Sequence, residues 1–327
     1  MRLACFHPAS VFCAWSVATG LVDTFNHMGH ETKEFPVDVT KQAIDPTSYP
    51  TADQLRGFDG IVISGPEHVR AHLLRLYPKW NKIPVPKVGW LHETIQREDY
   101  GMLNVENIQS FSDTTFCPAI QDEKYGFKWL PFGVDTAIFK PDWNQPKEHD
   151  VAFIGLIYPK RAQFLQKLQP FLKGITLRMG NVQVLDLNGV RVRDTAALYA
   201  DNLRKIKIFV NLPSLSELVV TKVHESLACG AFLITPAIPE TRNFDDIQAH
   251  FYDREKPAEL VERIRFCLDH EDERIAAAKL CCEQMHRLHR LELRCQVLVD
   301  ALETPRKSRS PQHAFEPQLA AHAGSAE

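Results

Sequence analysis

Short apolar runs alternate with longer amphipathic segments in the first part of the chain. Gly60–Ser64 and Pro84–Leu91 are two such runs, and their nearly continuous apolar character is typical of strands that helices cover on both faces of a parallel sheet. Val11–Met28 and Val69–Tyr77 have the length and composition of helices. This order predicts a doubly wound α/β sheet. The other strands predicted in this part are Met1–Phe6, Lys33–Val37, Phe111–Phe116 and Phe127–Leu130.

The same alternation begins again after a polar, proline-containing segment at residues 142–149. Asp150–Leu156 predicts a strand, Pro159–Leu172 a helix and Lys207–Leu212 another strand. The chain therefore contains a second α/β series of similar size to the first. Its remaining predicted elements are the strands Ile175–Met179 and Ala231–Thr235, and the helix Asp194–Lys205.

From Pro257 to Leu302, apolar residues recur at intervals of three and four, which predicts helices with one core-facing stripe. We place His286 and His289 on the solvated side of these helices. After Glu303 the periodicity is lost and Pro, Ser and Ala become frequent, which predicts a disordered tail. The predicted domains are a first domain, a linker, a second domain with the terminal helices, and a tail, at residues 1–141, 142–149, 150–303 and 304–327.

The composition is that of a soluble globular protein. The chain has 327 residues, 44% of them hydrophobic, and a net charge of −3, which argues against nucleic acid or an anionic membrane as the main partner. Its eight cysteines have no zinc-ligand spacing and lie mostly in apolar surroundings, so we expect buried, reduced thiols. The first residues lack the apolar core of a signal peptide, and no apolar run is long enough to span a bilayer. We expect a cytoplasmic protein.

The stretch Pro213–Gly230 carries the strongest candidate chemistry. Glu217 and Glu225 are separated by seven residues, and Lys222 lies between them, near the start of a predicted helix. A helix N-terminus attracts anions and disfavours a cation, so an anion bound nearby would explain Lys222. Carboxylates accept hydrogen bonds from sugar hydroxyls. The simpler alternative is that both glutamates are ordinary carboxylates at a helix start.

Two further groups of residues follow predicted strands. Gly155 comes after one strand, and Lys160 and Arg161 open the next helix, an arrangement that suits a phosphate. His92 and Glu93 lie just past the end of the strand Pro84–Leu91, where ligands of open α/β sheets bind. The alternatives are a solvated helix start for the first group and a solvated loop for the second. Together, the cations and carboxylates fit a nucleoside-diphosphate sugar.

Four segments resemble glycosyltransferases of the GT-B fold, in the group that includes the glycosyl transferases group 1 and the CgeB-like proteins. The matching segments are LPFGVDTAIFKP (Leu130–Pro141), DVAFIGLIYPKR (Asp150–Arg161), PSLSE with the pair Glu217 and Glu225, and HESLACGAFLIT (His224–Thr235). The sequence departs from this group at Leu218–Val220, where glycines are usual after the first glutamate, and at Lys222, where CgeB-like proteins usually have arginine.

The resemblance implies two Rossmann-like domains facing across a cleft, with the acceptor bound by the first and the donor by the second. It implies that Glu225 binds the ribose and Glu217 the donor sugar. Arg161 and Lys222 would bind the diphosphate. Gly155 would let the diphosphate approach the backbone, and His92 or Glu93 would face the reacting centre.

The same resemblance implies transfer without a metal or other cofactor, usually with retention of configuration at the sugar carbon. No Asp-x-Asp pair in the sequence is placed to hold a metal. The acceptor, whether a small molecule, a glycan or a protein, is left open. Two alternatives remain at this stage: a nucleotide-sugar 2-epimerase of the same fold, and a non-catalytic protein that binds sugar nucleotides.

Overall fold

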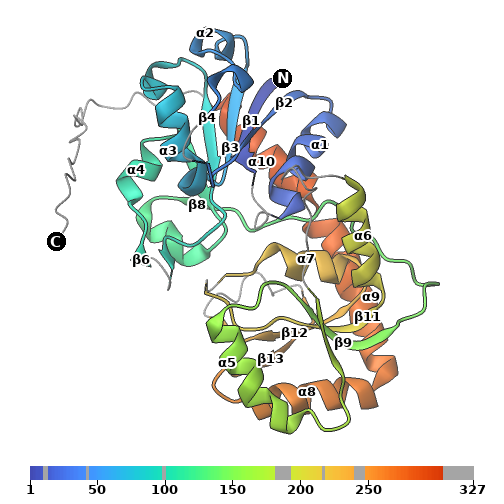
Figure 1. The fold of residues 1–327 in the computed structure, drawn as a ribbon. Helices are drawn as coiled ribbons and strands as arrows, with labels where there is room; N and C mark the ends of the chain where they lie inside the picture. Colours follow the sequence, from blue (N-terminus) through green and yellow to red (C-terminus); the bar gives the residue numbers. More distant parts are fainter. Residues whose placement is uncertain are drawn as a thin grey trace, which may run out of the picture.

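The computed structural model describes residues 1–9, 14–41, 44–97, 101–180, 193–215, 218–238 and 247–304. These residues form two parallel β-sheets, each in its own domain, with the first domain above the second in Figure 1. The two α/β domains with parallel sheets that the sequence predicts are therefore present. None of the helices in these ranges is long and apolar enough to cross a membrane.

The first domain contains a six-stranded sheet in the order β2-β1-β3-β4-β7-β8, and every pair in it is parallel. Its strands are β1 (Arg2–Pro8), β2 (Glu31–Val37), β3 (Gly60–Ser64), β4 (Lys87–Trp90), β7 (Thr114–Cys117) and β8 (Lys128–Trp129). The helices are α1 (Thr19–His27), α2 (Ala52–Leu55), α3 (Pro66–Leu76) and α4 (Val105–Gln109), and a small antiparallel pair is formed by β5 (Gln96–Arg97) and β6 (Gly101–Met102).

Alternate residues of β1 show why its run is apolar throughout. Leu3 and Cys5 belong to one core cluster, on the side of α1, while Ala4 and Phe6 belong to another, on the side of α3. Because successive side chains of a strand point to opposite faces, a strand covered on both sides needs apolar residues at every position. All five residues of β3 are buried for the same reason.

The second domain contains a five-stranded parallel sheet in the order β10-β9-β11-β12-β13. Its strands are β9 (His149–Ile154), β10 (Leu177–Gly180), β11 (Ile206–Val210), β12 (Phe232–Pro236) and β13 (His250–Tyr252). The helices α5 (Pro159–Leu168) and α8 (Pro257–Asp269) share one core cluster with this sheet, and α6 (Arg193–Arg204), α7 (Thr221–Ala228) and α9 (Glu271–Leu288) share the other. The sequence pattern had not indicated β13.

The helix predicted at Val11–Met28 starts later than expected. Residues 10–13 lie outside the described ranges, a short 3₁₀ turn covers Trp15–Val17, and α1 begins only at Thr19. Gly20 packs under the indole of Trp15, so closely that a Cβ there would lie 2.5 Å from Trp15 Nε1. The indole itself belongs to a core cluster of the second domain. Tertiary contact therefore takes Trp15 out of the helix.

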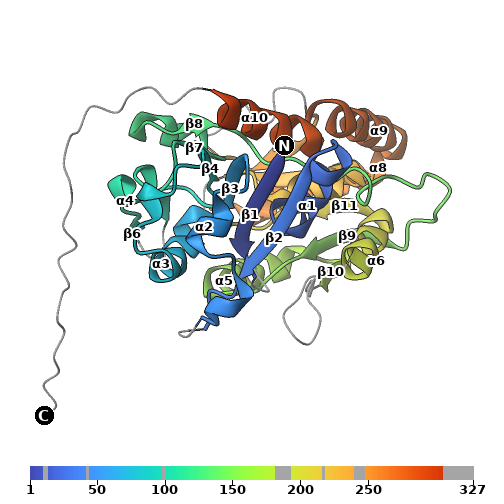
Figure 2. The same cartoon turned by 90° about the horizontal axis from the view of Figure 1, so that it is seen from above.

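The terminal helix α10 (Leu291–Glu303) packs on the first domain, although its sequence had been grouped with the second. Leu291, Cys295 and Leu298 lie in the core cluster that also contains Leu3 and Trp90. Figure 1 shows α10 beside the first sheet, and Figure 2 shows α9 and α10 following each other along one side of the molecule. The chain therefore crosses between the domains twice.

The two crossings of the chain between the domains, near Val134 and near His289–Leu291, lie against each other. Val134 N–H donates to the carbonyl of His289, and Leu291 N–H donates to the carbonyl of Val134, at 2.9 Å each. A Cβ at Gly133 would crowd this contact, because it would lie 3.1 Å from the His289 carbonyl oxygen. His289 is 7% exposed, so its predicted place on a solvated face is wrong: the crossing covers it.

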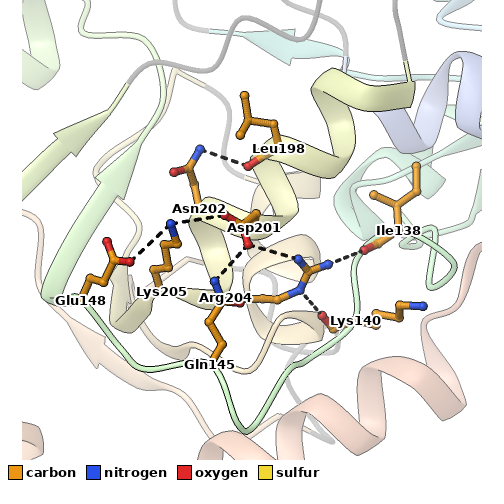
Figure 3. A network of polar contacts seen from close by, with 9 residues as sticks. All are labelled: Ile138, Lys140, Gln145, Glu148, Leu198, Asp201, Asn202, Arg204 and Lys205. Atoms are coloured by element: carbon orange, nitrogen blue, oxygen red, sulfur yellow. Dashed lines mark hydrogen bonds and ion pairs between the residues drawn. The ribbon is translucent and has the colours of Figure 1, made fainter.

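The predicted linker and the residues just before it are tied to the end of helix α6 and to the next residue, Lys205. Arg204 donates to the carbonyls of Ile138 and Lys140, and Lys205 pairs with Glu148 at 3.3 Å (Figure 3). Gln145 donates to the Asp201 carboxylate at 3.0 Å. These contacts fix residues 138–148 against the second domain. All seven cysteines of the described ranges are buried thiols, in agreement with the sequence.

Arg294 joins both crossings, and we predict that Arg294→Ala destabilises the protein by about 3 kcal/mol. The guanidinium donates to the carbonyls of Pro131, Leu288 and Phe132 and to Nδ1 of His289, so its loss leaves buried acceptors without a donor. Thermal and denaturant unfolding measure the change. Arg290→Ala, on an exposed side chain of the same crossing, is the control. Equal melting temperatures for the two variants would contradict this account of the crossing.

Candidate functional site

The structure describes seven of the eight predicted site residues. Gly155, Lys160, Arg161, Lys222 and Glu225 belong to the second domain. His92 and Glu93 belong to the first domain. Glu217 lies outside the described residues, together with Ser216.

Arg161 and Lys222 lie close to the same aromatic ring. Arg161 is the third residue of α5, and its Cζ is 5.0 Å from the centroid of the Phe153 ring. Lys222 is the second residue of α7, and its Nζ is 4.5 Å from the same centroid. Phe153 stands near the carboxyl end of β9, so the two helices bring their first turns together over the end of the sheet. The structure thus brings together the two cations that the resemblance had assigned to one diphosphate.

Gly155 lies at the same point. Its φ is 155°, and a Cβ there would lie 3.1 Å from Lys222 Nζ and 2.9 Å from Phe153. A larger residue would therefore crowd the lysine and the ring. Lys160 is half-buried in the first turn of α5, next to Arg161. Gly155, Arg161 and Lys222 thus meet around the Phe153 ring at the carboxyl end of the second sheet, and Lys160 lies in the same helical turn as Arg161.

Backbone carbonyls hold the Arg161 guanidinium in place. Nε donates to the carbonyl of Pro213 at 2.9 Å, and Nη1 donates to that of Leu156 at 2.8 Å. The hydroxyl of Tyr158 donates to the same Pro213 carbonyl, and its ring lies 4.4 Å from the guanidinium carbon. Arg161 is 5% exposed, and burial lowers the pKa of its guanidinium. The side chain is thus fixed before any ligand arrives.

The surroundings of Lys222 disfavour a positive charge on its ammonium. Burial, and then the charge of Arg161, lowers the pKa of its ammonium well below the usual range, while Glu225 acts in the opposite direction. Within the part of the chain that the structure describes, no carboxylate forms an ion pair with Lys222 or Arg161. Val220 caps α7 without a side-chain hydrogen bond, so the positive end of the helix dipole adds to both charges. The arrangement favours an anion such as a phosphate.

Glu225 lies one turn further along α7 and reaches the first domain. Its side chain is 2% exposed, and its Oε1 accepts a long hydrogen bond of 3.4 Å from the hydroxyl of Ser16. The Ser16 hydroxyl accepts from the backbone N–H of Asp135, and the Trp15 indole donates to the Asp135 carboxylate at 2.9 Å. Burial and the charge of Glu225 raise the pKa of Tyr199 nearby.

His92 and Glu93 follow β4, where the sequence placed them. Nε2 of His92 is 2.7 Å from the hydroxyl of Ser64, which donates to the carbonyl of Val17 at 2.5 Å. The Glu67 carboxylate accepts from the backbone N–H groups of His92 and Glu93, at 2.7 and 3.0 Å. Since Val17 adjoins Ser16, contacts connect His92 to Glu225 across the two domains. Both side chains are half-buried at the carboxyl edge of the first sheet.

Sequence reasoning had missed Trp15, Ser16, Ser64 and Glu67. Ser64 ends a buried apolar strand, which is a weak signal for a functional hydroxyl. The others depend on contacts between distant parts of the chain. The apolar departure at Leu218–Val220 now has a reason: Leu218 packs into the first domain's core cluster and Val219 into that of the second. These residues hold the loop before α7 across both domains.

Comparisons with known proteins agree with this fold. Residues 161–300 match the model of a family described as glycosyl transferase-like. No curated protein matches the chain in sequence. The resemblance to the glycosyl transferases is thus confirmed for residues 161–300.

Solved structures cover nearly the whole chain. Sucrose-phosphate synthase from Thermosynechococcus elongatus has a TM-score of 0.66 at 12% identity, over 92% of this chain and 99% of that one. HepE from Anabaena, in complex with UDP-glucose, has a TM-score of 0.60 at 9% identity, over 92% and 99%. An alpha-glucosyltransferase in complex with UDP and a mismatched 13-mer DNA has a TM-score of 0.60 at 13% identity, over 93% and 100%. These likenesses confirm the predicted GT-B fold.

We predict that Lys222→Met stabilises the protein in the absence of ligand. At a pH below the lowered pKa of Lys222, the folded chain must hold a desolvated ammonium, whereas methionine fills the site without charge. The gain in melting temperature should be largest near neutral or acidic pH and should shrink as the pH rises toward about 10.4, the ordinary lysine value. Thermal unfolding across this pH range measures it.

Inorganic diphosphate completes the test of the same site. It should raise the melting temperature of the wild type and of Lys167→Met, an exposed lysine on α5, but not that of Lys222→Met. A Lys222→Met variant that is less stable at every pH, or that responds to diphosphate as the wild type does, would contradict an anion site at Lys222.

Proposed function

We propose that the protein is a glycosyltransferase that transfers a hexosyl group from a nucleoside-diphosphate sugar, in keeping with the glycosyl transferase-like sequence of residues 161–300 and the GT-B fold of the chain. The proposal rests on one observation: Arg161 and Lys222 are both buried beside the Phe153 ring, at the N-terminus of α7. The negative charge of a donor diphosphate would balance the positive charges of this pair. Structural neighbours in complex with UDP-glucose or UDP favour a uridine donor.

The diphosphate binds over the carboxyl end of the second sheet in this proposal. Arg161, Lys222 and Lys160 balance its charge, and Gly155 lets it approach the backbone. When the bond between the sugar carbon and the diphosphate oxygen breaks, negative charge grows on the leaving oxygen. Fixed cations and the α7 dipole stabilise that charge without reorganisation, which is a large part of the catalytic effect in such sites.

Glu225 binds the ribose of the donor. Its Oε1 already accepts a hydrogen bond from a hydroxyl, that of Ser16, and a ribose hydroxyl has the same chemistry. Glu217, whose role comes from the resemblance alone, would bind hydroxyls of the donor sugar. The separation of seven residues would give the two carboxylates different parts of one ligand.

His92 and Glu93 face the reacting centre from the first domain. The contacts from Glu225 through Ser16, Val17 and Ser64 to His92 support this role, because they connect the donor helix to the carboxyl edge of the first sheet. A new bond forms between the sugar carbon and an acceptor oxygen, and the acceptor proton passes to the leaving diphosphate. Transfer with retention and without a metal is the course that we propose.

The acceptor binds to the first domain and is a small molecule, a glycan or a protein. The net charge of −3 disfavours nucleic acid, although one structural neighbour was solved with DNA. A hydrolysis assay avoids the need to know the acceptor, because water can take its place.

We predict that the purified protein hydrolyses UDP-glucose, or a related UDP-sugar, slowly in the presence of EDTA. Glu225→Gln should weaken binding of UDP about tenfold, since it removes a charged acceptor, whereas Glu283→Gln on the exposed face of α9 should bind as the wild type does. Release of UDP and isothermal titration calorimetry measure the two effects. Failure of a panel of UDP- and GDP-sugars to bind or react would refute the proposed function, and interconversion of intact UDP-sugars would indicate an epimerase.

A further inference from the structure

The carboxylate proposed to bind the ribose is enclosed by protein in the structure. Glu225 is only 2% exposed. A hydrogen bond from a ribose hydroxyl needs an oxygen–oxygen distance of about 2.7 Å, so the ligand must come into direct contact with this carboxylate. Binding of a donor therefore has to displace a group of the protein that now covers Glu225.

Ser16 of the first domain is a covering group whose chemistry matches that of the incoming hydroxyl. It is fully buried, and its hydroxyl donates to Oε1 of Glu225 at 3.4 Å. A ribose hydroxyl is also an alcohol and donates to a carboxylate in the same way. Because the carboxylate is buried, the two hydroxyls compete for this oxygen.

The contact with Glu225 is the longest of the hydrogen bonds that hold the turn around Ser16 against the second domain and the first crossing. The Trp15 indole donates to the Asp135 carboxylate at 2.9 Å, and the backbone N–H of Asp135 donates to the Ser16 oxygen at 3.3 Å. A hydrogen bond of 3.4 Å is weaker than one near the usual O–H···O distance. Exchange of the Ser16 hydroxyl for a ribose hydroxyl can therefore gain free energy while Trp15 keeps the turn anchored.

The exchange takes place between the two domains. Glu225 belongs to α7 of the second domain, and Ser16 lies in the 3₁₀ turn Trp15–Val17 that precedes α1 of the first domain. A ligand that takes the oxygen of Glu225 breaks this contact between the domains. The affinity for the ligand is then lowered by whatever free energy the contact supplies in the free protein.

We propose that Ser16 occupies the place of a ribose hydroxyl on Glu225 in the free protein, as an autoinhibitory contact that the donor must displace. The inference rests on the proposed function for the identity of the incoming hydroxyl. It makes Ser16 a determinant of how tightly the protein binds a ribonucleotide and how strongly it prefers one to a deoxyribonucleotide.

Binding of UDP, 2′-deoxy-UDP and 3′-deoxy-UDP, measured by isothermal titration calorimetry, tests this competition. Ser16→Ala removes the competing hydroxyl and should raise the affinity for UDP about fivefold, the effect of one modest hydrogen bond. The deoxynucleotide that lacks the hydroxyl bound by Glu225 should gain much less, because it does not have to displace Ser16. The preference for ribose should thus be greater in Ser16→Ala than in the wild type.

Three further variants separate competition from a general effect on the fold. Thr24→Ala also removes a buried hydroxyl, one that donates to the carbonyl of Gly20, and should leave all three affinities unchanged. Ser16→Cys keeps nearly the size of serine with a weak donor, so it should show the same gain even if Ser16→Ala unfolds. In a Glu225→Gln background, Ser16→Ala should gain less, because the neutral amide holds either hydroxyl more weakly.

The possible failures are distinct. If UDP binds to the wild type and the preference for ribose is the same in the wild type, Ser16→Ala and Ser16→Cys, this inference is overturned while the proposed function stands. Weaker binding of UDP by both Ser16 variants would also overturn it, since Ser16 would then support Glu225 rather than compete with the ligand. If no nucleotide binds to any variant, the proposed function fails, and the inference that rests on it fails too.

Discussion

Two positive charges held out of water beside the Phe153 ring are the constraint on which the site depends. The chain fixes Arg161 with backbone carbonyls of Pro213 and Leu156 and brings Lys222 to the same ring from another helix. Burial disfavours the charged form of both side chains and the two charges repel each other, so a bound anion would stabilise them. A site that costs stability in the free protein, and binds an anion in return, is the arrangement expected of preorganised electrostatic catalysis.

The first domain completes this site through a few residues. Trp15 packs into the core of the second domain, and Ser16 reaches Glu225 beside it. The two crossings of the chain, joined by Arg294, hold the domains in the arrangement that makes these contacts possible. Leu218 and Val219 anchor the loop before α7 in both cores. Helix α7 and the carboxyl edge of the first sheet are thus parts of one structure.

The sequence predicted what depends on local pattern. Buried runs such as Gly60–Ser64 were read correctly as parallel strands, and Glu225, Lys222 and Arg161 were found because they stand next to predicted strand ends and helix starts. Features that depend on contacts between distant parts of the chain were not predicted. Trp15 interrupts a helical pattern because it packs on the other domain, and the apolar stripe of α10 does not say which core it joins.

Proton uptake on donor binding tests the central claim most directly. Burial and Arg161 lower the pKa of the Lys222 ammonium in the free protein, and a bound diphosphate would raise it, so binding of UDP-glucose must take up protons at pH values between the two. Calorimetric titration in two buffers with different heats of ionisation measures this number, and UDP-glucose contributes no phosphate that titrates in this range. We expect uptake of up to about one proton by the wild type and almost none by Lys222→Met. Tight binding with the same heat in both buffers would contradict the account.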